Sequence, residues 1–338
     1  MRRIVATIAF NTRDVAANDG PIARAPPSAH TPPRRATASV LSALVVAMSA
    51  ALSASALSSS RVLAGSRRVR SSGVRAAPVR RPAVLPRASA TPAEKSNVVV
   101  IGGTGATGSE CVVQALARGA KVTVLARTPS KLAWPPGTGG EKEGSPIADP
   151  NLTVVQGSVT DPAAVARCIT KDTTGVVVSL GGKTKDVGKT MLTDGTRNVI
   201  DAMKAAGVAR VAVVTSIGAG DSADQAPLVF KVLMATVMRS IFDDKNNQEQ
   251  LFLGPAGPGR DLEFCIVRPG GLGTGPPTGV VNVIDGQAGS IARADVADFC
   301  LGALFEEDFP YVKKAPCISS TGGTSWVKDR KGKGMMEA

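Results

Sequence analysis

Residues 98–116 read VVVIGGTGATGSECVVQAL, and this stretch predicts a strand, a tight turn and a helix in succession. A β-branched apolar run ends at Ile101, glycines follow at even spacing, and apolar residues then recur with helical spacing. Glycines let the backbone approach a pyrophosphate, and the helix start offers it free N–H groups. The pattern therefore predicts a dinucleotide-binding turn, with a tight turn that holds no ligand as the alternative. The expected contacts are Gly102, Thr104, Gly105, Ala106, Thr107 and Gly108.

The charge of the chain is concentrated at its start. The formal net charge is +13, but fourteen arginines and only two acids, Asp14 and Asp19, lie up to Ala93. This segment therefore carries +12 and the remaining residues about +1. A basic body would indicate a nucleic-acid partner, whereas a nearly neutral body with a basic leader indicates targeting. We expect no nucleic acid among the partners.

The first 95 residues have the composition of a targeting leader. No acid lies between Gly20 and Glu94, and arginine, serine, alanine and proline dominate. That composition is typical of a plastid transit peptide, with a mitochondrial one as the alternative. The apolar run 40–57 is compatible with the hydrophobic region of a two-part leader or with a short membrane span, and Met48 is a second possible start. We expect a leader at 1–95, an NAD(P)-binding domain at 96–323 and a flexible tail at 324–338.

Strand and helix patterns alternate through the body of the chain. Such alternation with short links predicts an α/β fold with a doubly wound parallel sheet, whose ligands lie at the carboxyl ends of the strands. We expect Asp161 or Thr160 to cap one helix and Gly207 to end another. The expected strands are 97–101, 121–126, 152–156, 175–180, 210–215 and 263–267, and expected helices include 193–206 and 294–304.

The second of these strands ends at an arginine where an NAD site would carry an acid. Arg127 follows that strand, and Lys131 lies four residues later. Cations at this place suit the 2′-phosphate of NADP(H), since no carboxylate repels it. The sequence thus predicts NADP(H) as the cofactor, and a solvated surface arginine is the alternative.

Further expected cofactor contacts follow the third and fourth strands. Ser158 and Val159 come after the third strand, where Val159 is compatible with an adenine face or with core packing. Lys183 is a candidate phosphate contact, although a solvated lysine is the simpler interpretation. The remaining candidates after the fourth strand are Leu180, Gly181 and Gly182.

Histidine chemistry and metal chemistry have little support in the sequence. The only histidine is His30, in the leader, and the five cysteines form no CxxC pair. A histidine-based catalytic triad and a histidine metal site are therefore not expected in the body, and no metal is predicted. The cysteines are interpreted as buried, reduced thiols.

Taken together, GGTGATG, Arg127 and the segment TDGTRNVIDAMKAAGVARVAVVTS resemble the atypical short-chain dehydrogenase/reductases. Within them the chain is similar to the NmrA-like NAD(P)H-binding branch, which includes biliverdin-IXβ/flavin reductases and plastid-targeted relatives. The resemblance extends over 96–323. It implies the strand order 3-2-1-4-5-6-7. It also implies a turn near the nicotinamide formed by Pro269, Gly270, Gly271 and Leu272.

The chain departs from the wider superfamily in its catalytic pair. Members that reduce carbonyls carry Tyr-x-x-x-Lys on the helix after the fifth strand, but the only tyrosine here is Tyr311, far downstream. Lys245 remains a candidate ribose contact, with a solvated lysine as the alternative. Ser216 is a candidate substrate contact, or it closes the turn after the strand.

The missing proton donor narrows the expected reaction. A carbonyl needs a proton as its oxyanion forms, whereas a flavin, quinone or tetrapyrrole spreads the charge and takes its proton from water. We expect an NADPH-dependent reductase of such a conjugated small molecule. The alternative is an NADP(H)-binding scaffold or assembly factor in the plastid with little turnover.

Two segments of the body have further predicted roles. The apolar stretch 226–242 is expected to form a helix over the substrate side, or else to dock on a membrane or a protein partner. Asp295 is expected to cap the helix 294–304. The oligomeric state is left open by the sequence.

Overall fold

The computed structural model describes residues 96–181, 188–321 and 324–325. Its centre is a sheet in the order β3-β2-β1-β4-β5-β6-β10, parallel throughout, and β8 and β11 extend it as antiparallel strands. The expected doubly wound fold is confirmed, with β10 as the seventh strand of the predicted order. The strands are β1 (Asn97–Ile101), β2 (Lys121–Ala126), β3 (Leu152–Gln156), β4 (Gly175–Val178), β5 (Arg210–Val214), β6 (Glu263–Pro269), β8 (Asn282–Val283), β10 (Cys317–Ser319) and β11 (Thr324–Ser325).

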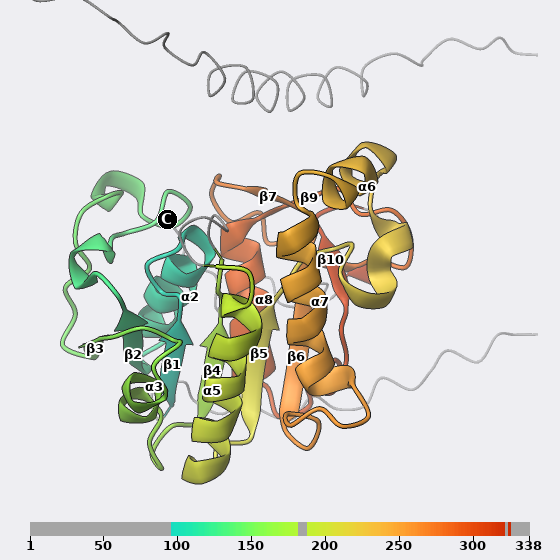
Figure 1. Ribbon diagram of the computed structural model, residues 1–338. Coiled ribbons are helices and arrows are strands. Elements are labelled where there is room, and N and C mark those ends of the chain that lie inside the picture. The colour runs from blue at the N-terminus through green and yellow to red at the C-terminus, as the bar shows by residue number, and fades with distance from the viewer. Residues whose placement is uncertain (1–95, 182–187, 322–323, 326–338) are drawn as a thin grey trace, which may run out of the picture. The chain divides into compact units, whose positions relative to one another are not determined.

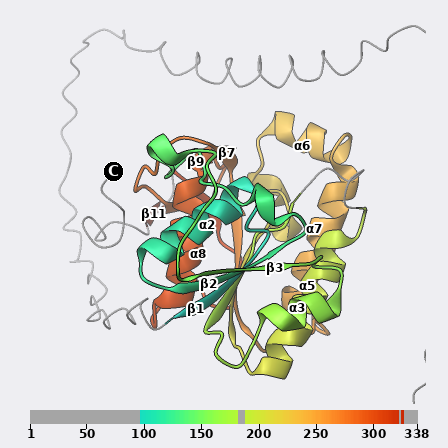
Figure 2. The same ribbon diagram turned by 90° about the vertical axis from the view of Figure 1, so that its left-hand side faces the viewer.

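Helices cover both faces of this sheet. One face carries α2 (Ala106–Ala117) and α8 (Arg293–Phe305), and the other carries α3 (Pro162–Cys168), α5 (Met191–Ala206) and α7 (Arg239–Leu253) (Figure 1; Figure 2). A small pair, β7 (Gly271–Gly273) with β9 (Ser290–Ala292), stands apart from the main sheet. The described residues also include the short 3₁₀ turns η2 (Pro129–Lys131), η3 (Gly140–Lys142) and η4 (Gly220–Gln225).

The core has two halves, one on each side of the sheet. Val98 and Val100 of β1 pack into the half under α2 and α8, whereas Val99 and Ile101 pack into the half under α3, α5 and α7. Successive side chains of a strand point to opposite faces, so a strand covered on both sides reads as a continuous apolar run. This is why the β-branched run before the glycines marks the centre of the sheet.

The expected helix ends are confirmed at two positions. The Asp161 carboxylate accepts a hydrogen bond from the Ala163 N–H at 3.0 Å and caps α3. Gly207 ends α5 with φ 75°, a left-handed conformation that glycine adopts without a steric penalty. The start of α5 has a cap that the sequence did not indicate, because Asp244 of α7 accepts from the Leu192 and Thr193 N–H groups at 2.9 and 3.0 Å.

The stretch 226–242 does not form the single helix that was expected over the substrate side, and its docking on a membrane or a partner stays a prediction. It forms α6 (Leu228–Ala235), a break at 236–238, and the start of α7. None of the residues of α6 is buried. The apolar sequence resembled a core element, but only part of it contacts the rest of the molecule.

Two smaller expectations are also corrected. Asp295 does not cap its own helix; its carboxylate instead accepts from the Thr278 and Gly279 N–H groups, each at 3.0 Å, and holds the loop before β8. The flexible tail was expected from Thr324, but Thr324 and Ser325 form β11 beside β8. The leader, the run 40–57 and the rest of the tail lie outside the described residues. Among the described helices, none has the length and apolar character needed to cross a membrane.

Candidate functional site

The glycine turn between β1 and α2 is built by close backbone contacts. A Cβ on Gly102, whose φ is +87°, would lie 2.2 Å from the Ser179 carbonyl oxygen, and one on Gly108 would lie 2.2 Å from the Gly102 oxygen. Gly103, which was not among the expected contacts, has no room for a side chain either, because its Cβ would lie 2.7 Å from Val124 Cγ1. These glycines therefore bring the turn against β4 and fix where α2 begins.

Most of the other residues of this turn face solvent. Thr104, Gly105 and Ala106 are exposed, whereas Thr107 is buried. Gly105 precedes the first turn of α2. That turn contains no acid, and no described side chain caps the start of the helix. The first N–H groups of a helix carry partial positive charge and lack partners within the helix. The turn thus presents an anion-binding surface at the carboxyl end of β1.

Two cations stand at the neighbouring strand end. Arg127 directly follows β2, Lys131 closes η2, and both are exposed. The end of β2 is joined to the turn after β3 by a hydrogen bond, in which the Gly157 N–H donates to the Ala126 oxygen at 3.1 Å. A phosphate monoester beside β2 would meet these cations and no carboxylate from residues 127–131.

The turn after β3 places Ser158 and Val159 in different environments. The Ser158 and Thr160 hydroxyls lie 2.8 Å apart within the turn. Val159 is buried, and a Cβ on Gly195 of α5 would lie 2.7 Å from its Cγ1. Packing is thus the observed environment of Val159, and adenine contact stays a prediction.

The residues after β4 are only partly described. Leu180 is half-buried beside the α5 half of the core, and Gly181 is exposed with no atom within 4 Å of an added Cβ. Gly182 and Lys183 lie outside the described residues.

Ser216 and Lys245 come together at the carboxyl end of β5. The Lys245 Nζ donates to the Thr215 carbonyl oxygen at 3.0 Å, and the Ser216 hydroxyl donates to the Ile217 oxygen at 3.0 Å. Desolvation lowers the pKa of Lys245 to about 8, although the charges of Glu249 and Asp244 oppose the change. An amine with such a pKa exchanges protons near neutral pH, as catalytic groups often do.

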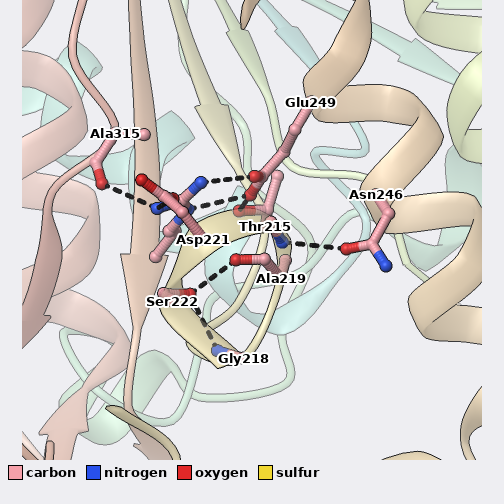
Figure 3. A network of polar contacts seen from close by, with 10 residues as sticks. Thr215, Gly218, Ala219, Asp221, Ser222, Asn246, Glu249 and Ala315 are labelled. Atoms are coloured by element: carbon pink, nitrogen blue, oxygen red, sulfur yellow. Dashed lines mark hydrogen bonds and ion pairs between the residues drawn. The ribbon is translucent and has the colours of Figure 1, made fainter. Parts of the chain in front are cut away.

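A buried ion pair is hydrogen-bonded to the same turn through Thr215, and Figure 3 shows Glu249 reaching toward it. Glu249 Oε1 accepts from the Thr215 hydroxyl at 2.7 Å and from Arg268 Nε at 3.1 Å, and Oε2 accepts from Arg268 Nη2 at 2.6 Å. Arg268 Nη1 reaches Asp221 of η4 at 2.5 Å. Burial alone would lower the pKa of the Arg268 guanidinium, but the bonds to Glu249 and Asp221 outweigh it and raise that pKa.

The backbone of the turn after β5 packs closely against the ion pair at Gly220. Gly220 has φ +57°, and a Cβ there would lie 2.6 Å from both Arg268 Nη2 and Glu249 Oε2. The Gly220 N–H donates to Asn246 Oδ1 at 2.9 Å, so α7 holds the turn through Lys245, Asn246 and Glu249. No sequence motif indicated this network.

The turn after β6 lies next to the turn after β5. The Ile217 N–H donates to the Pro269 oxygen at 3.0 Å, which ties the two turns together. Pro269 and Gly270 are buried, and a Cβ on Gly270 would lie 2.1 Å from the Gly289 oxygen. Gly271 and Leu272 are exposed in β7. The exposed part of this expected nicotinamide turn is therefore Gly271 and Leu272.

The substrate side offers no phenol to complete a Tyr/Lys pair. Ile241 stands four residues before Lys245, and Tyr311 packs against Phe299 with ring centroids 5.7 Å apart. Burial raises the pKa of Tyr311. The five cysteines are free and buried, as expected. Among the described residues, no group of three or more His, Cys, Asp or Glu side chains could hold a metal.

Comparison with known proteins agrees with this geometry. A family model described as NAD(P)H-binding matches residues 102–307. An uncharacterized chloroplastic protein of Arabidopsis thaliana is 31% identical over 224 residues, which cover 62% of this chain and 72% of that protein.

Solved structures share the fold at lower identity. An oxidoreductase of Lactococcus lactis superposes with a TM-score of 0.53 at 17% identity, over 68% of this chain and 92% of that one. A short-chain dehydrogenase/reductase of Veillonella parvula in complex with NADP superposes with a TM-score of 0.52 at 14% identity, over 69% and 98%. Such identities establish a shared fold, and the family match confirms the predicted dinucleotide cofactor.

Proposed function

This chain belongs to the NAD(P)H-binding family, and from that premise we propose that it is an NADPH-dependent reductase of a conjugated acceptor in a plastid. The observation that carries the proposal is the convergence of functional groups on one edge of the sheet. The uncapped start of α2, the cation Arg127 and the Lys245 amine all lie at carboxyl ends of parallel strands, where ligands of such folds bind.

The residues present fit a phosphorylated dinucleotide. The first N–H groups of α2 would hold the pyrophosphate, because they lack partners within the helix. Arg127 and Lys131 would hold the 2′-phosphate, which favours NADPH over NADH. When bound, the nicotinamide supplies a hydride. Exposed Gly271 and Leu272 and the Ser216 turn would border it on the acceptor side.

The lack of a proton-donating side chain four residues before Lys245 restricts the class of acceptor that the protein could reduce. Ile241 has no proton to give, and the Tyr311 ring is packed beside Phe299. A conjugated acceptor spreads the incoming charge over its ring and takes its proton from water. Lys245 and Ser216 would orient the cofactor ribose and the acceptor, which is the positioning contribution to the rate.

The plastid location rests on two supports. Residues 1–95 have a transit-like composition, and the Arabidopsis relative is described as chloroplastic.

An acceptor panel tests the proposal. The full chain is mixed with NADPH, whose absorbance is followed with FMN, a benzoquinone and biliverdin in turn. We expect oxidation that depends on both the protein and one acceptor. Tight NADPH binding without oxidation by any of them would favour the alternative, a redox-responsive scaffold or assembly factor.

A further inference from the structure

Thr215, which directly follows β5, has a partner for each of its polar groups. Its N–H donates to the Val267 oxygen at 2.9 Å, and its hydroxyl donates to Glu249 Oε1 at 2.7 Å. Its carbonyl oxygen accepts from Lys245 Nζ at 3.0 Å. Thr215 is only 5% exposed, so little water competes for these bonds. The residue is therefore a fixed point between the sheet and α7.

Lys245 and Glu249 reach Thr215 from the same side of α7. They lie four residues apart, and residues at this spacing are neighbours on one helix face. Glu249 holds the side chain of Thr215 (Figure 3), and Lys245 bonds its backbone. The three residues thus close a ring, in which the bond to the hydroxyl fixes the carbonyl that holds the amine.

The Glu249 carboxylate is itself held in one orientation. Arg268 Nε donates to its Oε1 at 3.1 Å, and Arg268 Nη2 donates to its Oε2 at 2.6 Å. Two such bonds from one guanidinium fix the plane of a carboxylate as well as its place. Both side chains are buried. Because Arg268 belongs to β6, the sheet sets the orientation from which Glu249 reaches Thr215.

The Lys245 amine has further donors. An ammonium group has three N–H donors, and among the described residues the Thr215 oxygen is its hydrogen-bond partner. Lys245 is half-buried, and this bond places its amine beside the turn that begins at Ser216. Its other donors are thus available to the hydroxyl groups of a bound ribose, which is the contact proposed above.

The charged groups around this amine have other partners. On α7 they are Glu249, which pairs with Arg268, and Asp244, which accepts from the N–H groups at the start of α5. On η4, Asp221 pairs with the other end of the same guanidinium. The described residues therefore hold the amine through a carbonyl oxygen and not through an ion pair.

We propose that Glu249 is a positioning residue for Lys245. By fixing the hydroxyl of Thr215, it holds the Thr215 carbonyl where the amine meets the ribose of the cofactor. The inference rests on the cofactor contact in the proposed function and names the residue on which that contact depends. A lysine side chain loses much rotamer freedom when it is held, so an amine held before the cofactor arrives binds it more tightly. The buried ion pair thereby serves cofactor binding as well as stability.

The test removes the hydroxyl of Thr215, because replacing Glu249 would strand a buried arginine and endanger the fold. Thr215→Val deletes the bond to Glu249 and keeps the carbonyl, and Thr215→Ser restores a hydroxyl. Thr196→Val is the matched control, since the buried Thr196 hydroxyl accepts from Gln248 of the same helix at 2.8 Å. The ion pair stays intact in all three variants, so each should fold.

The first measurement is acylation of Lys245 by acetic anhydride in the full chain without cofactor, followed by peptide mass spectrometry. Only the neutral amine reacts, so a series from about pH 6 to about pH 10 reports its pKa. We expect a midpoint at about pH 8 in the native chain, Thr215→Ser and Thr196→Val. In Thr215→Val the released amine regains water, so its pKa should rise toward the ordinary value and labelling at pH 8 should slow by about fivefold or more.

The second measurement adds NADPH. The cofactor should slow the acylation of Lys245 in the native chain, because a bound ribose covers the amine. Its affinity, titrated by calorimetry, should fall by about tenfold in Thr215→Val. Thr215→Ser and Thr196→Val should keep the native affinity.

The outcomes separate this inference from the proposed function. An unchanged midpoint and affinity in Thr215→Val, or equal changes in Thr196→Val, would overturn the inference and leave the cofactor contact standing. NADPH that binds the native chain without slowing the acylation of Lys245 would overturn both the contact and the inference. Neither result depends on turnover, so the acceptor panel still decides whether the protein is a reductase.

Discussion

Glu249 and Arg268 form a buried ion pair that joins the ends of β5 and β6. The two residues lie on α7 and β6, and Oε2 of Glu249 is 2.6 Å from Nη2 of Arg268. The same carboxylate accepts the Thr215 hydroxyl, so the ends of two strands share one anchor. Ser216 and Pro269, which begin the two turns beside the proposed acceptor side, directly follow Thr215 and Arg268.

We predict that Glu249→Ala lowers the free energy of unfolding by about 3–5 kcal/mol. The change would leave the Arg268 guanidinium buried, with Asp221 as its remaining carboxylate partner. Urea denaturation measures the loss. The control is Glu263→Ala, whose carboxylate pairs with Arg210 at 2.8 Å and is 44% exposed, so it should cost about 1 kcal/mol or less. Equal losses in the two variants would contradict the role given to burial.

Arg127→Asp should invert the cofactor preference. Loss of a charge-assisted bond to the 2′-phosphate weakens NADPH binding by roughly 10- to 100-fold, and the new carboxylate suits the ribose hydroxyls of NADH. Fluorescence titration with each cofactor measures both affinities. Lys121→Asp makes the same charge change at the opposite end of β2 and should leave both unchanged. If Lys121→Asp weakens NADPH binding as much as Arg127→Asp does, the loss of affinity comes from the change in net charge, and the contact predicted for Arg127 is wrong.

Gly108→Ala should abolish NADPH binding and destabilise the domain. The added Cβ would lie 2.2 Å from the Gly102 oxygen, so the glycine turn has to move. Gly286→Ala is the control, because nothing lies within 4 Å of its Cβ. Calorimetric titration and thermal unfolding give the two readouts. Native affinity in Gly108→Ala would show that the turn does not define the cofactor site.

Lys245→Met should stabilise the protein at neutral pH. Desolvation lowers the pKa of Lys245 to about 8, so at pH 7 the folded state carries a charge in a poorly solvated place. The cost, about 3 kcal/mol, is complete below pH 8 and disappears as the pH rises toward the unfolded pKa. Denaturation at pH 7 and at about pH 10 should therefore show a gain from Lys245→Met that shrinks as the pH rises. A gain that does not change with pH would contradict the lowered pKa.

Residues 1–95 fused to a fluorescent reporter should carry it into plastids of a plant cell. The prediction follows from the arginine-rich, acid-poor composition of the segment. A reporter that stays in the cytosol would refute the leader interpretation, and one in mitochondria would correct the compartment.

The local parts of the fold could be predicted, because they depend on local chemistry. β1, β2 and β3 begin and end where the apolar runs do, and Gly207 ends α5 through its left-handed conformation. Whether α6 is covered or left exposed stayed open at the sequence level, since its residues are as apolar as a core helix and only tertiary contacts decide which side is covered.

The polar residues of the site could be predicted only where they belong to a recognisable sequence motif. The glycines and Arg127 follow strand ends in a recognisable pattern. Glu249 and Arg268 lie 19 residues apart and carry no such pattern, so their contact depends on how α7 lies beside β6. Asp295 looked like a cap because it stands near a helix start, but its carboxylate turns to Thr278 and Gly279 instead.

The most direct test of the account is the relative affinity of the full chain for NADPH and NADH. Each cofactor is titrated into the protein by calorimetry at the same ionic strength. We predict that NADPH binds at least about tenfold more tightly than NADH, because Arg127 and Lys131 would meet the 2′-phosphate. Equal affinity, tighter binding of NADH, or no binding of either cofactor would contradict it.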